Sequence, residues 1–289
     1  MSSVRVGRHF DMKTVFSTEL AQLHVSAVQS FISSKVSAAA SVLTESKREQ
    51  FRRIKRSKKL YAVAHGKYIY NLCQLDRDWQ IAALVGELKT ADSLGSDLII
   101  HTGNCLKLER KVAAVTFVRQ ISDVLSAHPE LRNILILENA AGKGSELCSS
   151  LVELAAVWNS FDATIRQRLG ICLDTCHLWD AGELRFSNVI EVDNFLKKFD
   201  KMIGLQYIKV IHINDSMYPF GSKRDIHANI LHGYITDPTK GGNRVGFAYF
   251  CHVATRLGVP LILETPMKEN WSDEVKMVQC WAAGGPWIF

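Results

Sequence analysis

The sequence predicts an α/β protein that folds as a single (β/α)8 TIM barrel, and three observations support this. Short apolar runs rich in β-branched residues recur along the whole chain. Longer segments with helical spacing of apolar residues lie between them, and such alternation implies a parallel sheet. Seven runs in 289 residues favour a closed eight-stranded barrel over an open sheet.

Seven strands are expected, and several of them are continuously apolar, as strands buried on both faces should be. They are Val4–His9, Leu60–His65, Asp97–His101, Ile134–Glu138, Gly170–Asp174, Lys209–His212 and Pro260–Glu264. An eighth strand is expected between Ile213 and Phe247, where the pattern is weaker.

Helical spacing is clearest in four segments between these strands. They are Trp79–Leu94, Lys107–Ser126, Ser145–Trp158 and Glu191–Met202. Neither a linker nor a change in composition divides the chain, so we expect residues 1–289 to form one domain.

The composition excludes several classes of protein. Apolar residues make up 47% and charged residues 22%, an ordinary globular mixture. The net charge of +6 is compatible with a polyanionic partner but also with a mildly basic enzyme. Seven cysteines without a CxxC pair argue against a zinc finger and suggest buried thiols in a reducing compartment.

No targeting or membrane segment is evident in the sequence. The first residues, MSSVRVGRHF, lack the apolar core of a signal peptide, and no apolar run is as long as a membrane span. We therefore expect an intracellular protein of the nucleus or cytoplasm without membrane contact. We also expect it to be a monomer.

Six of the expected strands end in a residue that can bind a metal ion. These residues are His65, His101, Glu138, Asp174, His212 and Glu264. One polar residue at a strand end is ordinarily just the start of a loop. Six in succession, all of them His, Asp or Glu, indicate a metal site at the carboxyl ends of the strands, where barrel active sites lie. His9 ends the first strand and is expected to support the ligands.

Further candidate ligands follow in two short motifs. His177 comes three residues after Asp174, and Asp225 and His227 are two residues apart, which puts them on one face if the backbone is extended. Nine ligands are too many for one ion and suggest two or three. Mixed imidazole and carboxylate ligands favour zinc, with manganese or iron also compatible.

Four ordered motifs carry a resemblance to a known family. They are Leu173–Leu178 preceded by Gly170, Ile136–Ser145, His212–Asp215 followed by Phe220–His227, and Ile262–Pro266. In this order and spacing they resemble the endonuclease IV type of apurinic/apyrimidinic (AP) endonucleases. The likeness runs from about Val4 to Lys276.

The resemblance implies a site of three zinc ions, with manganese as the alternative metal. The first ion would take His65, His101 and Glu138. The second would take Glu138, Asp174, His212 and Glu264, so that Glu138 bridges the two, and these six residues would form the catalytic set. The third would take His177, Asp225 and His227.

The resemblance also implies an activity and a partner. The activity is hydrolysis of the phosphodiester on the 5′ side of abasic sites in double-stranded DNA, leaving a 3′-hydroxyl and a 5′-deoxyribose phosphate. Expected DNA contacts are Tyr68, Lys35, Lys223 and Arg224, although the loop Phe31–Ser37, placed after the first strand, offers only Lys35.

Some features depart from the family or leave alternatives open. Residues Ala228–His232 stand where a Gly-x-Gly loop is common, and Ala282–Phe289 is unusual; a divergent, viral source would explain both. The basic run Arg52–Lys59 is read first as the solvated face and end of a helix, and second as a DNA contact or nuclear address.

Two other functions compete with the nuclease. A sugar isomerase or epimerase on a similar barrel also gathers His, Asp and Glu at the mouth, but needs only one or two metals and no group of His177, Asp225 and His227. A non-catalytic DNA-binding protein on the same fold would not need an intact ligand set.

Overall fold

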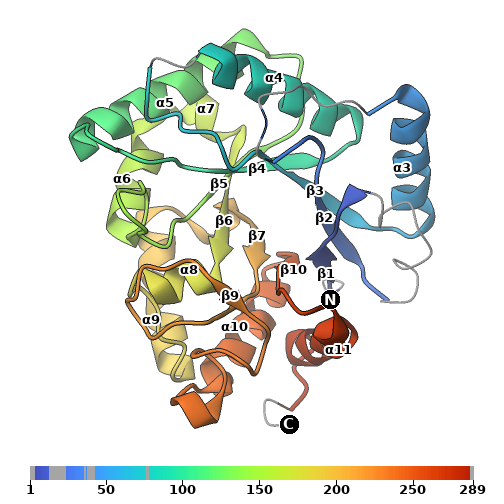
Figure 1. Ribbon diagram of the computed structural model, residues 1–289, viewed down its shortest axis with the longest axis vertical. Coiled ribbons are helices and arrows are strands. Elements are labelled where there is room, and N and C mark those ends of the chain that lie inside the picture. Colours follow the sequence, from blue (N-terminus) through green and yellow to red (C-terminus); the bar gives the residue numbers. More distant parts are fainter. Residues whose placement is uncertain (1–3, 13–23, 36, 38–42, 76–77, 287–289) are drawn as a thin grey trace.

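The computed structural model describes residues 4–12, 24–35, 37, 43–75 and 78–286. Within them eight parallel strands close into a barrel in the order β1-β10-β7-β6-β5-β4-β3-β2 (Figure 1). The barrel strands are β1 (Val6–His9), β2 (Ala27–Phe31), β3 (Tyr61–His65), β4 (Asp97–His101), β5 (Leu135–Glu138), β6 (Leu169–Asp174), β7 (Ile208–His212) and β10 (Leu261–Leu263).

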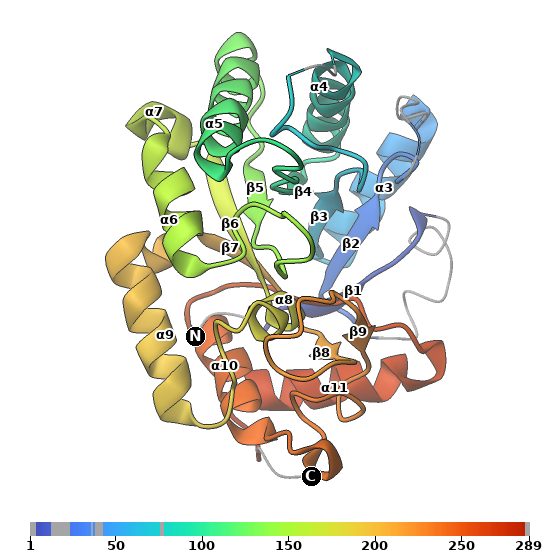
Figure 2. The same cartoon turned by 60° about the vertical axis from the view of Figure 1, so that its left-hand side comes forward.

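Helices surround the barrel on its outside (Figure 2). They are α3 (Glu45–Ser57), α4 (Asp78–Ser93), α5 (Arg110–Ala127), α6 (Leu151–Ser160), α7 (Ala163–Arg166), α8 (Thr175–Asp180), α9 (Val189–Met202), α10 (Arg244–Arg256) and α11 (Trp271–Ala282), with 3-10 turns at Leu205–Tyr207, Pro238–Lys240 and Lys268–Asn270. The predicted (β/α)8 barrel is confirmed. In the described part of the chain, no helix is both long and apolar enough to cross a bilayer.

The seven expected strands are present, with ends shifted by no more than two residues. The expected position of the eighth was wrong. It is β2, which pairs with β1 and β3, so the loop containing Lys35 follows the second strand of the barrel and not the first. The sequence hid β2 because Gln29 and Ser30 interrupt its apolar pattern, although both are buried.

The segment in which an eighth strand was expected forms a different structure. It contains a short antiparallel pair, β8 (Asp215–Ser216) and β9 (His227–Ala228), outside the barrel sheet. The helix expected at Ser145–Trp158 also begins later, at Leu151. Residues before it form a loop tied to the end of β4, where Leu147 N donates to Gly103 O at 2.9 Å.

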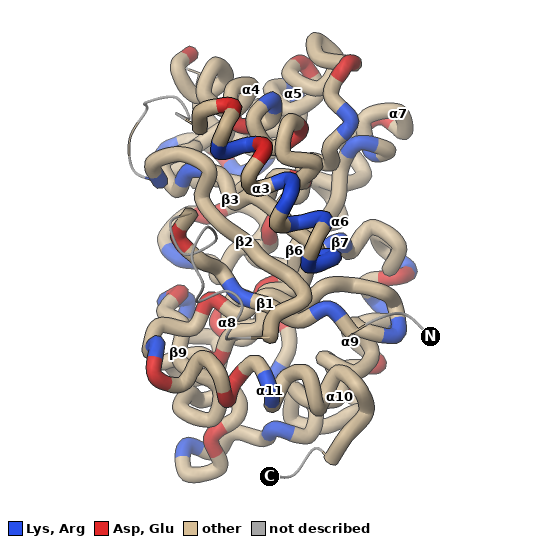
Figure 3. Tube along the Cα trace, turned by 90° about the vertical axis from the view of Figure 1, so that its right-hand side faces the viewer, with Lys and Arg blue, Asp and Glu red and all other residues tan. Residues whose placement is uncertain are grey.

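Helix α3 contains most of the basic run. Only Phe51 of this helix is buried, while Arg53, Arg56 and Lys58 are exposed at and beyond its carboxyl-terminal half. Figure 3 shows stretches of Lys and Arg along the trace of α3. Their arrangement agrees with the solvated-face interpretation.

An apolar layer fills the barrel interior and determines where the strand ends point. It consists of one residue from each of seven strands: Ala27, Val63, Ile99, Ile136, Cys172, Val210 and Ile262. Side chains two residues apart on a strand face the same side. The residue two positions after each member therefore also points inward, at the mouth of the barrel.

Candidate metal centre

The residues two positions beyond the apolar layer form a ring at the barrel mouth. In strand order from β2 they are Gln29, His65, His101, Glu138, Asp174, His212 and Glu264. Six of these seven are the strand-end residues predicted from the sequence. The barrel thus brings together side chains that are up to 199 residues apart, from His65 to Glu264.

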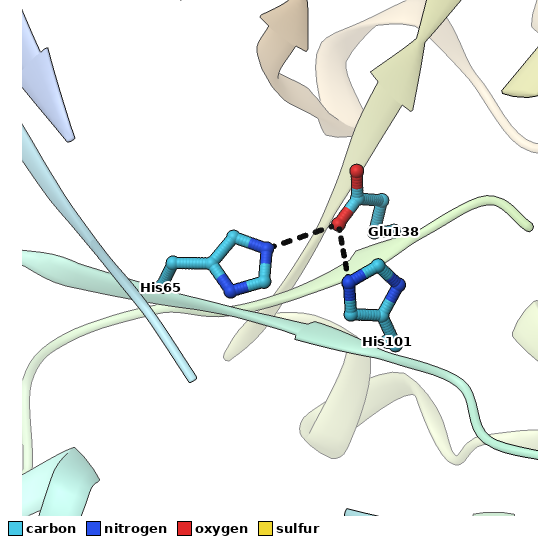
Figure 4. A group of neighbouring side chains, drawn as sticks. All are labelled: His65, His101 and Glu138. Carbon is cyan, nitrogen blue, oxygen red and sulfur yellow. Dashed lines mark hydrogen bonds and ion pairs between the residues drawn. The ribbon is translucent and has the colours of Figure 1, made fainter. Parts of the chain in front are cut away.

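Glu138 occupies the centre of the first group of candidate ligands. Its Oε2 lies 3.3 Å from His65 Nε2 and 3.6 Å from His101 Nε2, and Figure 4 shows both rings pointing at that oxygen. His65 Nδ1 lies 2.8 Å from Gly66 O, which leaves Nε2 to face the site. These three residues form one of the clusters that could hold an ion.

The other oxygen of Glu138 faces a second group. Its Oε1 lies 2.7 Å from His212 Nδ1, and the same nitrogen is 3.6 Å from Asp174 Oδ2 and 3.3 Å from Glu264 Oε2. All four residues have ligand atoms within 4.8 Å of one another. Each group thus receives one oxygen of Glu138, as a carboxylate that bridges two ions requires.

The third predicted group also comes together, but its geometry differs from the prediction. His177 Nε2 lies 2.9 Å from Asp225 Oδ1, and His227 Nε2 lies 3.8 Å from the same oxygen. Asp174 Oδ2 is 3.6 Å from His227 Nε2, and the cluster of atoms within 4.8 Å comprises Asp174, His177 and His227. The condition of an extended backbone is not met at Asp225, whose φ of 55° places it in a left-handed turn.

Sequence reasoning missed the polar residues that hold these ligands. Gln29 Oε1 lies 2.8 Å from His212 Nε2, and Gln29 Nε2 donates to Glu264 Oε1 at 2.6 Å. His9, as expected, joins this contact, with its Nδ1 3.4 Å from Glu264 Oε1. Gln29 was missed because its strand was missed.

Two asparagines next to predicted ligands have a similar role. Asn214 Nδ2 donates to Asp174 Oδ2 at 2.7 Å, and its Oδ1 accepts from Glu264 N at 2.8 Å. Asn139 Oδ1 accepts from Asp174 N at 2.8 Å. Both lie within motifs named from the sequence, Ile136–Ser145 and His212–Asp215, and that position was the available signal.

The site concentrates negative charge in a buried place. Burial favours the neutral carboxylic acid, but His212 and His101 outweigh it and hold the pKa of Glu138 well below its ordinary value. Burial lowers the pKa of His177, yet Asp174 and Asp225 together raise it well above the usual range. Ionised carboxylates this deeply buried need cationic partners.

This donor set fits divalent ions of the zinc type. Imidazoles and carboxylates are the ligands that zinc takes, and a bound cation would balance the buried carboxylates that now raise the pKa of His177 and His212. His227 Nε2 is buried and has no hydrogen-bond partner among the described residues, although it faces Asp174 and Asp225. A buried imidazole nitrogen without a hydrogen-bond partner is free to coordinate a metal ion.

Seven of the nine candidate ligands, all except Asp174 and His212, line a cavity of about 580 Å³ that opens at the barrel mouth. A second hollow of about 520 Å³ shares Tyr68, His227 and Glu264 with it and also contains Lys35. Tyr68 N donates to Lys35 O at 3.0 Å, so these two predicted DNA contacts lie together beside the site.

The other two predicted DNA contacts lie in the turn before Asp225. Arg224 lies over the Tyr218 ring, with 5.1 Å from its Cζ to the ring centroid. Lys223 lies against Gly142, on the loop that follows β5. Neither residue lines the two cavities described above.

Comparisons with known proteins agree with this fold and site. The sequence profile of the xylose isomerase-like TIM barrel family matches residues 19–280. A probable endonuclease 4 of Alkaliphilus oremlandii is 32% identical over 222 residues, which are 75% of this chain and 74% of that protein. The apurinic-apyrimidinic endonuclease 1 of Saccharomyces cerevisiae is 32% identical over 74% of this chain and 57% of its own length.

A solved structure extends the likeness to nearly the whole chain. Endonuclease IV from Thermus thermophilus superposes with a TM-score of 0.79 at 26% identity, covering 97% of this chain and all of the other. The fold and the His/Asp/Glu ring define a xylose isomerase-like barrel with a candidate metal centre at its mouth. Within that broad group, this chain belongs to the endonuclease IV family of nucleases.

Proposed function

We propose that this protein hydrolyses the phosphodiester on the 5′ side of abasic sites in double-stranded DNA, leaving a 3′-hydroxyl and a 5′-deoxyribose phosphate. The observation that carries the proposal is the gathering of three groups of candidate ligands around Glu138 and Asp174 at the mouth of one barrel. We propose that these groups hold about three zinc ions, with His65, His101, Glu138, Asp174, His212 and Glu264 as the catalytic set and His177, Asp225 and His227 around the third ion.

Divalent ions of this type supply Lewis-acid catalysis, because they neutralise phosphate oxygens and lower the pKa of water. The residues of the chain hold such ions at fixed positions. Glu138 fixes two groups relative to each other, since each of its oxygens faces one of them. Gln29 and Asn214 orient His212, Asp174 and Glu264 through direct hydrogen bonds.

No side-chain nucleophile is required. Cys176 lies within the signature motif, but it is fully buried and burial raises the pKa of its thiol well above the ordinary value. A thiol held in the neutral form is a poor nucleophile. The attacking group is therefore proposed to be water.

Recognition is proposed to depend on the backbone and on the missing base. An abasic nucleotide has no base to unstack, so it is extruded from the helix at lower cost than an intact nucleotide. The cavity of about 580 Å³ would receive the extruded sugar and phosphate. Tyr68 and Lys35 would contact the DNA beside it, with Lys223 and Arg224 on the turn that leads to Asp225.

The third group distinguishes this proposal from a sugar isomerase or epimerase. Those enzymes share the barrel, but one or two metals suffice for them. His177, Asp225 and His227 would then have no purpose, yet the structure places them together with an unsatisfied nitrogen facing the carboxylates.

Cleavage of a duplex containing one abasic site, with and without chelator, tests the proposal. We expect a single cut on the 5′ side, lost on chelation and restored by zinc or manganese, and elemental analysis should give about three ions per chain.

Binding should favour abasic over intact duplex and weaken steeply with salt. Active protein with one ion or fewer would refute the trinuclear site, and turnover of ketoses without DNA cleavage would favour the isomerase.

A further inference from the structure

Helix α8 ends in an acid that belongs to none of the metal groups. The helix starts after Asp174, contains His177, and finishes at Asp180, whose side chain has no exposed surface. Asp180 stands three residues after His177, so one short helix contains both a candidate ligand and a second buried carboxylate. Such a carboxylate must have hydrogen-bond donors around it.

The first donor to Asp180 is the backbone of another candidate ligand. Asp225 N donates to Asp180 Oδ2 at 2.7 Å, and Lys223 N donates to the backbone oxygen of Asp180 at 3.0 Å. Both donors lie in a left-handed turn, with φ of 57° at Lys223 and 55° at Asp225. Residues other than glycine adopt this conformation at a cost, so the turn needs contacts that hold it.

The second donor connects Asp180 to the remaining member of the group. Ser216 Oγ donates to Asp180 Oδ1 at 2.7 Å. Ser216 lies in β8, directly opposite His227 in β9. The α8 helix and the β8–β9 pair lie side by side, as Figures 1 and 2 show.

We propose that Asp180 is the positioning residue for the third metal group. It is linked to His177 through the helix, to Asp225 through the backbone N–H, and to His227 through Ser216. Within the described residues, its hydrogen bonds go to Ser216 Oγ and to the backbone of the turn, not to a candidate ligand atom. The inference rests on the proposed function, because it assumes that His177, Asp225 and His227 hold an ion.

The experiment compares Asp180→Ala with the wild-type protein, using zinc stoichiometry and zinc affinity as readouts. Loss of the carboxylate leaves Asp225 N without its acceptor and leaves Ser216 Oγ with Tyr218 O alone, at 3.2 Å. The left-handed turn then keeps only its backbone bond from Lys223 N to Asp180 O and is held less firmly at Asp225. We expect the affinity for one of three ions to fall by about 10- to 100-fold, the usual effect of removing a partner outside the ligand shell. The other two ions should stay bound.

Two variants keep the test sharp if Asp180→Ala is poorly folded. Asp180→Asn retains one acceptor oxygen and should show a smaller loss of zinc. Adding Lys223→Gly to Asp180→Ala should recover part of the affinity, because glycine adopts the left-handed turn without strain. The melting temperature of each variant, measured alongside zinc affinity, separates a local recovery at the turn from a general gain in stability.

Asp92→Ala is the matched control. Asp92, in α4, also accepts from two backbone N–H groups: its Oδ1 lies 2.9 Å from Arg132 N and 3.0 Å from Asn133 N. These two donors lie on the loop that precedes β5. Asp92→Ala should lose stability without losing an ion. Three tightly bound ions in Asp180→Ala would overturn this inference alone, whereas fewer than three in the wild-type protein would overturn it together with the trinuclear site.

Discussion

The strand-end ligands and the third group reach the same cavity by different structural means. His65, Glu138 and His212 are the last residues of parallel strands, and their side chains are no more than 2% exposed, although His101, which also ends a strand, is 30% exposed. Asp225 and His227 come from a turn and a two-residue strand outside the barrel, with side chains 28% and 20% exposed. The first set is held by the barrel itself, and the second by a small number of hydrogen bonds.

This difference should determine how each region responds to change. Strand ends are fixed by the apolar layer beneath them, so the loss of one ligand leaves the others in place. The third group depends on contacts such as that of Asp180 with Asp225 N. We therefore expect substitutions in the first region to affect chemistry most, and those in the second to affect the retention of one ion.

The largest expected effect is that of Glu138→Ala. Removing the carboxylate that faces two ligand groups should reduce cleavage by several orders of magnitude, because metal assistance contributes several kcal/mol to lowering the barrier. Rates on an abasic duplex under single-turnover conditions would measure it. Zinc content should fall by more than one ion.

A folded protein is essential for reading that result. Circular dichroism should match the wild type, and Glu130→Ala, an exposed acid beside His128, serves as a control that leaves cleavage unchanged. If folded Glu138→Ala cuts abasic DNA within about tenfold of the wild-type rate, the assignment of the centre is wrong.

A smaller effect is expected for His227→Ala. This change should remove one ion and lower cleavage by roughly a hundredfold, since the ligands of the other two groups remain. Elemental analysis combined with the cleavage rate would test it. Loss of all three ions would show that the strand-end ligands do not hold their ions independently of the third group.

Gln29→Ala tests the strand that the sequence concealed. Gln29 contacts His212 and Glu264 but is not itself a candidate ligand. We expect roughly a tenfold loss of zinc affinity or activity, typical of a residue that orients ligands. Wild-type zinc binding in this variant would mean that the barrel alone positions both ligands.

The two regions also differ in how far the sequence predicted them. Apolar runs ending in His, Asp or Glu were sufficient to place six ligands, because a parallel barrel brings all strand ends to one mouth. The same reasoning failed for β2, where a glutamine pointing into the site broke the apolar pattern. Gln29, which contacts two candidate ligands, therefore concealed strand β2 in the sequence.

The members of the third group were recognised as candidate ligands from two short motifs, but their assignment to one ion came only from the family resemblance. Nothing in the spacing of Asp225 and His227 indicates a left-handed turn, and the condition of an extended backbone is not met there. Helix α6 begins late for a related reason, since Ser145 O accepts from Cys105 N and Leu147 N donates to Gly103 O on the loop after β4. Long-range hydrogen bonds of this kind leave no periodic signal in a sequence.

The smallest effect is expected for Lys35→Ala, on the loop after β2. Lys35 is exposed and lies over the Phe31 and Tyr68 rings, with its Nζ 5.8 and 6.0 Å from their centroids. An exposed cation of this kind positions DNA phosphates and contributes little to chemistry. Cleavage at saturating DNA should therefore remain within about threefold of wild type, whereas the slope of log affinity against log salt should fall by about one. Titration of abasic duplex at several salt concentrations would measure the slope. An unchanged slope would remove Lys35 from the DNA interface, and a large loss of cleavage at saturating DNA would mean that this loop acts on the metal centre itself.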